Sequence, residues 1–112
     1  DPHPEAANTP EPGKRPLNNM CPTVVLRRGV PYTALGAAGG RRIVTSVFEV
    51  LLQIVAHDRA PAAALQAPRL HTEGDGAVTV DAGMAEEQAQ FLAGLGYTVR
   101  RGAMANVSLV TK

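Results

Sequence analysis

The chain of 112 residues is predicted to have an α+β fold in which helices pack against pairs of short strands. Two patterns lead to this class: short apolar runs flank glycine-containing turns, and two longer segments repeat apolar residues at helical spacing. A hydrophobic content of 45% and a charged content of 19% are those of an ordinary globular protein. One domain of this length can bury a core, though a small one.

Residues 1–16 are predicted to be an extended, proline-rich segment, and residues 17–112 to form the folded part. Five of the nine prolines lie in the first 16 residues, where they oppose regular helix and sheet. The chain has no initiator Met and ends on an apolar run, so we expect a fragment or a processed subunit of a longer protein.

The folded part is predicted to begin with a β-hairpin, with strands over 22–28 and 31–35 and a turn at Gly29. A long helix over 42–57 follows. The later elements are a short helix over 61–67, strands over 69–72 and 77–81, a helix over 84–95, and strands over 97–101 and 106–111.

The helix over 42–57 has the clearest periodicity. The apolar residues of one face are Ile43, Val47, Val50, Leu51 and Ile54, and those that widen this face are Val44, Phe48, Leu52 and Val55. We therefore expect the helix to be covered on most of its sides. The only polar line on it is Thr45, Glu49 and Gln53.

Between the hairpin and this helix lies a glycine-rich segment, residues 36–40, predicted to be a loop. Such a turn leaves the first backbone N–H groups of the helix free to face a negative charge, and the helix dipole adds to the attraction. Arg41 and Arg42 follow directly and favour an anion. The charge could belong to a phosphate, a carboxylate or an acyl oxyanion.

Chemistry alone favours a simpler interpretation of this loop, a tight connection into which only glycine fits. The segment contains neither the glycine spacing of dinucleotide sites nor the Gly-Lys-Ser/Thr ending of phosphate loops. Residues 36–39 match the short glycine loop of KH domains, but that loop joins two helices, whereas this one follows a strand.

Other candidate residues carry weaker signals. Asn18 and Asn19, just before the first strand, could hold the carboxylate or amide groups of a substrate, although an Asx-type turn is favoured. Cys21 is expected to be a small buried residue, because an activated thiol needs a neighbouring base. The histidines lack the spacing of metal ligands, and neither a metal nor a cofactor is expected; they are His3, His57 and His71.

Charge and hydropathy narrow the range of partners. Eleven basic and ten acidic residues give a net charge of +1, which argues against a nucleic-acid partner. No segment approaches the roughly 20 apolar residues of a membrane span. The single cysteine cannot form an internal disulfide.

Three segments together resemble one family. Residues 12–23, PGKRPLNNMCPT, resemble the PGKRPLSSMxPT stretch of the gamma-glutamyltranspeptidase family, and residues 35–43, LGAAGGRRI, resemble its LGSPGGSRII loop. Residues 67–71, APRLH, resemble its APRFHH strand. The segments follow the family's order and spacing over about the whole chain.

This resemblance implies a portion of the αββα sandwich of N-terminal-nucleophile hydrolases, with antiparallel strands and packed helices. In that family a self-cleaved precursor exposes an N-terminal threonine that attacks gamma-glutamyl amides such as glutathione. The resemblance places the oxyanion hole at Gly39 and Gly40. It places Asn18 and Asn19 where two serines hold the alpha-carboxylate of the glutamyl donor.

The resemblance also implies what the chain lacks. The nucleophilic threonine precedes this part of the family's small subunit, so no nucleophile is expected here and the chain alone is predicted to be inactive. Its partners would be the large subunit, the start of the small subunit and a gamma-glutamyl small molecule. The family's last strand is missing, which would favour self-association of the fragment.

Two alternatives stay open at this point. The replacement of Ser-Ser by Asn-Asn allows a related acylase that acts on another amide. The absence of a nucleophile allows a non-catalytic module that binds an anion at the glycine loop. The residues do not indicate a compartment, and the resemblance implies a periplasmic or secreted protein.

Overall fold

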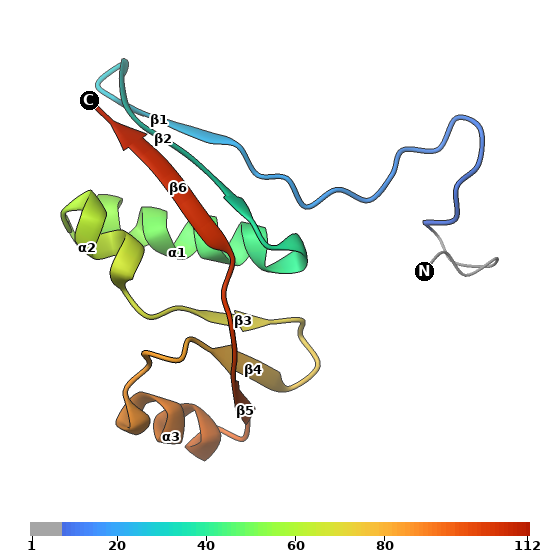
Figure 1. Cartoon of the computed structure of the whole chain (residues 1–112), viewed down its shortest axis with the longest axis vertical. Coiled ribbons are helices and arrows are strands. Elements are labelled where there is room, and N and C mark those ends of the chain that lie inside the picture. Colours follow the sequence, from blue (N-terminus) through green and yellow to red (C-terminus); the bar gives the residue numbers. More distant parts are fainter. Residues whose placement is uncertain (1–7) are drawn as a thin grey trace.

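The computed structural model describes residues 8–112, which form two three-stranded sheets and three α-helices (Figure 1). Residues 1–7 lie outside the described range, and with them His3 and the start of the predicted extended segment. Residues 8–22 contain no helix or strand and lead away from the folded body (Figure 1). No helix among the described residues is long and apolar enough to span a membrane.

The first sheet has the order β1-β2-β6, and all of its neighbours are antiparallel. Its strands are β1 (Thr23–Arg27), β2 (Val30–Ala38) and β6 (Asn106–Thr111). The predicted hairpin is present as β1 and β2. Its turn contains Arg28 and Gly29, both with positive φ, which explains why a glycine stands at the second position.

The predicted loop over 36–40 is shorter than expected. Its first three residues belong to strand β2, where Gly36 pairs with Ser108 and Ala38 pairs with Asn106 of β6. Strand β6 lies about 70 residues further along the chain, so local patterning could not reveal this partner. Only Gly39 and the short 3-10 helix η1 (Gly40–Arg42) connect the sheet to helix α1 (Ile43–Val55).

Helix α1 crosses one face of the first sheet, and helix α2 (Pro61–Gln66) lies against the second half of α1 (Figure 1). Proline at the first position of α2 is favourable, because its missing N–H would have no helical acceptor. The main core lies between these elements. It consists of Leu35, Ile43, Val47, Val50, Ile54, Ala64, Ala105 and Val107.

Helix α1 is covered on most of its sides, as expected, but the residues that were expected to widen its buried face form one exposed stripe. Four of its apolar side chains are 39–63% exposed: Val44, Phe48, Leu52 and Val55. They lie on the side of α1 that faces away from the sheet, and no described element covers them there. The helix is thus apolar on a wider arc than the sheet alone can bury.

The second sheet has the order β3-β4-β5, with strands β3 (Leu70–Thr72), β4 (Ala77–Val80) and β5 (Thr98–Arg101). Strands β3 and β4 are antiparallel. Strands β4 and β5 are parallel because helix α3 (Glu86–Gly94) carries the chain back between them. The core of this unit is small, with only Val78, Val80 and Met84 buried in its cluster.

Candidate functional site

Gly39 occupies a position that only glycine can fill. Its φ of 154° lies in a region that L side chains rarely adopt. A Cβ added at Gly39 would lie 2.6 Å from the Cβ and 2.7 Å from the Cα of Ala105, which is itself 1% exposed. The backbone of Gly39 is therefore pressed against the residue before β6, and this contact fixes where β2 ends.

Gly40 differs from Gly39 in its surroundings. It also has positive φ, 59°, but nothing lies within 4 Å of the position of its missing Cβ. The carbonyls of the two glycines accept bonds from the next turn: the N–H of Arg42 donates to Gly39 at 3.3 Å, and that of Ile43 donates to Gly40. The first N–H groups of this segment have no helical acceptor and lie at the positive end of the α1 dipole.

Asn18 and Asn19 precede β1, and the two glycines follow β2. The pairing of Thr23 with Leu35 is antiparallel, so the chain enters β1 at the end where it leaves β2 (Figure 1). The side chain of Asn18 accepts a bond from the N–H of Met20 at 2.9 Å, which is an Asx turn. That turn uses the amide oxygen of Asn18 and leaves its amide nitrogen to act as a donor.

Cys21 is half-buried and packs against the main core. Its Sγ lies 3.7 Å from Oγ1 of Thr23, and the Thr23 hydroxyl donates to the carbonyl of Cys21 at 3.2 Å. The contacts of Cys21 are thus those of a packed thiol beside a hydroxyl. The described residues contain no group of three or more His, Cys, Asp or Glu side chains that could hold a metal ion.

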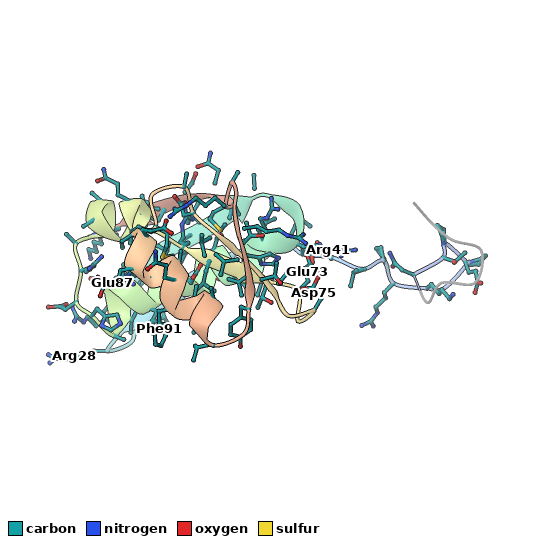
Figure 2. All side chains as sticks on the ribbon, turned by 90° about the horizontal axis from the view of Figure 1, so that it is seen from below. Arg28, Arg41, Glu73, Asp75, Glu87 and Phe91 are labelled. Atoms are coloured by element: carbon teal, nitrogen blue, oxygen red, sulfur yellow. The ribbon has the colours of Figure 1, made fainter. Side chains whose placement is uncertain are left out.

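A hydrogen-bonded chain that sequence reasoning missed joins the second sheet to η1. Oγ1 of Thr45 lies 2.9 Å from Nδ1 of His71, and Nε2 of His71 lies 3.3 Å from Oε1 of Glu73. The other oxygen of Glu73 accepts a bond from the Arg41 guanidinium at 3.2 Å. Figure 2 shows Arg41 and Glu73 together at one end of the folded body. His71 was expected only to lie in a strand, which it does.

The line of polar residues on α1 is the sequence signal that could have indicated these hydrogen bonds. It does not face solvent, because Thr45 contacts His71 and the carboxylate of Glu49 accepts a bond from the N–H of Leu70 at 2.9 Å. Burial raises the pKa of the Glu49 carboxyl, against the smaller opposing effects of the Leu70 bond and the Arg69 charge. A polar line on an apolar helix thus marks where α1 meets β3.

Arg69 extends the same contact toward the glycines. Its guanidinium donates to the carbonyl of Ala105 at 3.0 Å, and Ala105 is the residue that packs on Gly39. Three buried side-chain atoms near this junction have no hydrogen-bond partner among the described residues: Oγ of Ser46, Oε2 of Glu49 and Nε of Arg69. The second sheet therefore reaches the glycine turn mainly through polar groups.

Comparison with known proteins gives a consistent result. Residues 1–112 match the family model described as Gamma-glutamyltranspeptidase. The Acylase ACY 1 proenzyme of Pseudomonas sp. (strain SE83) is 36% identical over 101 residues, which are 90% of this chain and 18% of that protein. The Glutathione hydrolase proenzyme of Bacillus subtilis (strain 168) is 30% identical over 94 residues, 84% of this chain and 16% of that protein.

A solved structure agrees with these relatives. The gamma-glutamyltranspeptidase from Pseudomonas nitroreducens, complexed with L-DON, superposes with a TM-score of 0.86 at 32% identity. The match covers 96% of this chain and 59% of that one. The chain thus spans less than a fifth of the length of these two curated relatives.

Proposed function

The chain belongs to the gamma-glutamyltranspeptidase family, and we propose on this basis that it supplies the oxyanion-binding part of an acyl-transfer site. Its fold is a portion of an N-terminal-nucleophile hydrolase. The observation that carries the proposal is the turn at Gly39 and Gly40, where one glycine is pressed against Ala105 and the other is open on its outer side.

The chemistry assigned to this turn is electrostatic. When a nucleophile adds to the amide carbonyl of the donor, the carbonyl oxygen becomes an anion, and the N–H groups of Gly39 and Gly40 donate hydrogen bonds to it. Such bonds strengthen as charge develops, so they lower the barrier rather than only tightening substrate binding. Collapse of the intermediate breaks the C–N bond, and the amine leaves with the proton that the nucleophile gave up. This leaves an acyl-enzyme, which water or an acceptor amine then resolves.

Asn18 and Asn19 are proposed to hold the alpha-carboxylate of a gamma-glutamyl donor through their amide nitrogens. They precede β1 at the end of the hairpin where β2 leads to Gly39, and this chain direction supports the assignment. The nucleophilic threonine implied by the family resemblance would come from the rest of the parent protein. We therefore propose that these 112 residues alone do not turn over substrate and act together with that remainder.

The test is a pair of glycine variants in the full-length parent protein, assayed on a gamma-glutamyl anilide. Gly39→Ala forces a side chain into Ala105, moves the turn and should lower kcat by about 10²–10³-fold, as for the loss of an oxyanion donor. Gly29→Ala is the matched control, because Gly29 also has positive φ but lies in the β1–β2 turn with nothing near its missing Cβ. Equal kcat in the two variants would contradict the proposal.

A second candidate function is an acylase with a different donor. The Asn pair, in place of the family's two serines, and the 36% identity to the Acylase ACY 1 proenzyme favour it. Anilides with and without an alpha-carboxylate on the acyl group would separate the two. A preference for the donor that has the carboxylate, lost when Asn18 and Asn19 are changed to Ala, supports the gamma-glutamyl function; no preference supports the acylase.

A further inference from the structure

We propose that His71 is a positioning residue for the oxyanion turn, acting through a closed ring of hydrogen bonds that holds η1 from two sides. This inference rests on the proposed function, because it concerns the same turn. The ring consists of Arg41, the carbonyl of Arg42, Thr45, His71 and Glu73. Three of these residues belong to η1 and α1, and two belong to β3 and the turn that follows it.

The ring begins and ends on the segment that directly follows Gly40. The Thr45 hydroxyl donates to the carbonyl of Arg42 at 3.2 Å and also lies 2.9 Å from Nδ1 of His71. On the other side of the imidazole, Glu73 connects His71 to the guanidinium of Arg41, with distances of 3.3 and 3.2 Å. The ring, which is buried at His71 and exposed at Arg41 and Glu73, thus reaches both the backbone and a side chain of η1.

The count of hydrogens makes His71 the centre of the ring. The Thr45 hydroxyl has one hydrogen, so it either donates to the carbonyl of Arg42 and accepts from Nδ1 of His71, or donates to Nδ1 itself. Nε2 of His71 faces a carboxylate and donates to it. In either arrangement both ring nitrogens are engaged, so the connection between Thr45 and Glu73 passes through the imidazole.

The surroundings of His71 are suited to this role. Its side chain is only 8% exposed, and the charged groups that face it are Glu73 and, more distantly, Glu49. The bond from His71 and the charge and hydrogen bond of Arg41 hold the pKa of the Glu73 carboxyl below its ordinary value. Glu73 is thus kept ionised as the acceptor that connects the buried imidazole to the exposed arginine.

The burial of His71 also indicates that it positions the oxyanion turn and does not bind substrate. Its two ring nitrogens are already used by Thr45 and Glu73, so no ring atom is left for a substrate. The direction of the N–H groups at the turn depends on the orientation of η1. Because misplacement by about 1 Å can cost about 10²-fold in rate, a group that fixes η1 can control kcat without touching substrate.

The experiment uses matched variants of the full-length parent protein, assayed on a gamma-glutamyl anilide. Thr45→Val removes the hydroxyl at almost constant shape, and Thr45→Ser keeps it. We expect Thr45→Val and His71→Phe to lower kcat by about 10- to 100-fold with KM nearly unchanged, because the turn is displaced while the donor site is intact. Thr45→Ser should keep kcat within about threefold of the wild type.

Glu73→Gln keeps the test decisive if the buried variants fail to fold. It breaks one bond of the ring at an exposed position, and Glu86→Gln breaks the similar Arg101–Glu86 pair, 2.8 Å long, between β5 and α3. Of these two variants, we expect only Glu73→Gln to lower kcat. Equal kcat in these two variants, a wild-type kcat in Thr45→Val, or a loss confined to KM would overturn the inference.

The Gly39→Ala variant separates this inference from the function on which it rests. Loss of kcat in Gly39→Ala together with wild-type kcat in Thr45→Val and Glu73→Gln would overturn only the positioning role of His71. Wild-type kcat in Gly39→Ala would overturn the oxyanion function itself, and the positioning role with it.

Discussion

The two sheets of this chain hold the glycine turn by different means. The first sheet, with α1 and α2, buries eight residues in one apolar cluster and places Ala105 against Gly39. The second sheet, with α3, buries three residues in its own cluster and reaches the same turn through Arg69, His71 and Glu73. One unit therefore fixes the turn by shape, and the other fixes it by hydrogen bonds.

This difference predicts which substitutions should affect the stability of the fold and which should affect the geometry of the site. Apolar contacts are non-directional and contribute mainly to stability, whereas hydrogen bonds with defined donors contribute more to orientation. Damage to the first core should therefore lower the free energy of unfolding. Damage to the polar contacts should leave the fold intact and displace the turn.

The largest effect on stability should come from the first core. Val50→Ala and Val80→Ala delete the same atoms from two positions that are each 0% exposed. We expect Val50→Ala to cost about 2–3 kcal/mol and Val80→Ala about 1–2 kcal/mol, because the smaller cluster can collapse into the space left behind. Urea unfolding of the two variants measures both free energies. An equal or larger loss of stability at Val80 would contradict the expected difference between the two cores.

A smaller effect on the free energy of unfolding is expected at Glu49, the buried end of the polar contact between α1 and β3. Its pKa is raised by burial, so the protonated carboxyl is favoured in the folded state. The stability contributed by this proton is present at low pH and is lost as pH rises through the raised pKa. Glu49→Gln should remove that loss, so the gap in the free energy of unfolding between pH 4 and pH 7 should shift in favour of pH 7. Thermal melting at both values measures it, and an unchanged gap would contradict the assignment.

The smallest effect on stability is expected at Glu73, the exposed end of these polar contacts, and its pH dependence should have the opposite sign to that of Glu49. The pKa of Glu73 is lowered, first by the hydrogen bond from His71 and then by Arg41, so its contribution is present above the ordinary value of 4.5. It is lost as pH falls through the lowered pKa. Glu73→Gln should therefore be destabilising only above that range. Melting profiles between pH 3 and pH 7 test it, with Glu86→Gln as a second exposed carboxylate whose pKa is lowered by Arg101.

Local patterning predicted the elements of the fold well. The hairpin, both longer helices and the strand over 106–111 are present within a few residues of their predicted bounds. These are features that neighbouring residues determine among themselves. A tight connection into which only glycine fits was also predicted, and Gly39 agrees with it, because it has positive φ and no room for a Cβ beside Ala105. The family resemblance, and not local patterning, singled out Gly39 and Gly40 as a pair.

What the sequence did not reveal depends on contacts between distant residues. The extension of β2 through Gly36 depends on β6, and the contact between Thr45 and His71 joins positions 26 residues apart. The exposed face of α1 at Phe48 was missed for the same reason, since apolar spacing shows that a face can be buried but not what buries it. Periodicity thus indicates which face of a helix is apolar, whereas the topology of the fold determines which element packs against that face.

The most direct test of the central claim is a crystal structure of the parent protein with a boronic acid analogue of the gamma-glutamyl group bound to its nucleophile. Such an adduct is tetrahedral and carries an oxygen where the oxyanion would form. The proposed function predicts this oxygen within about 2.7–3.1 Å of the backbone nitrogens of Gly39 and Gly40. An adduct oxygen that faces other donors, with both glycine nitrogens unused, would contradict it.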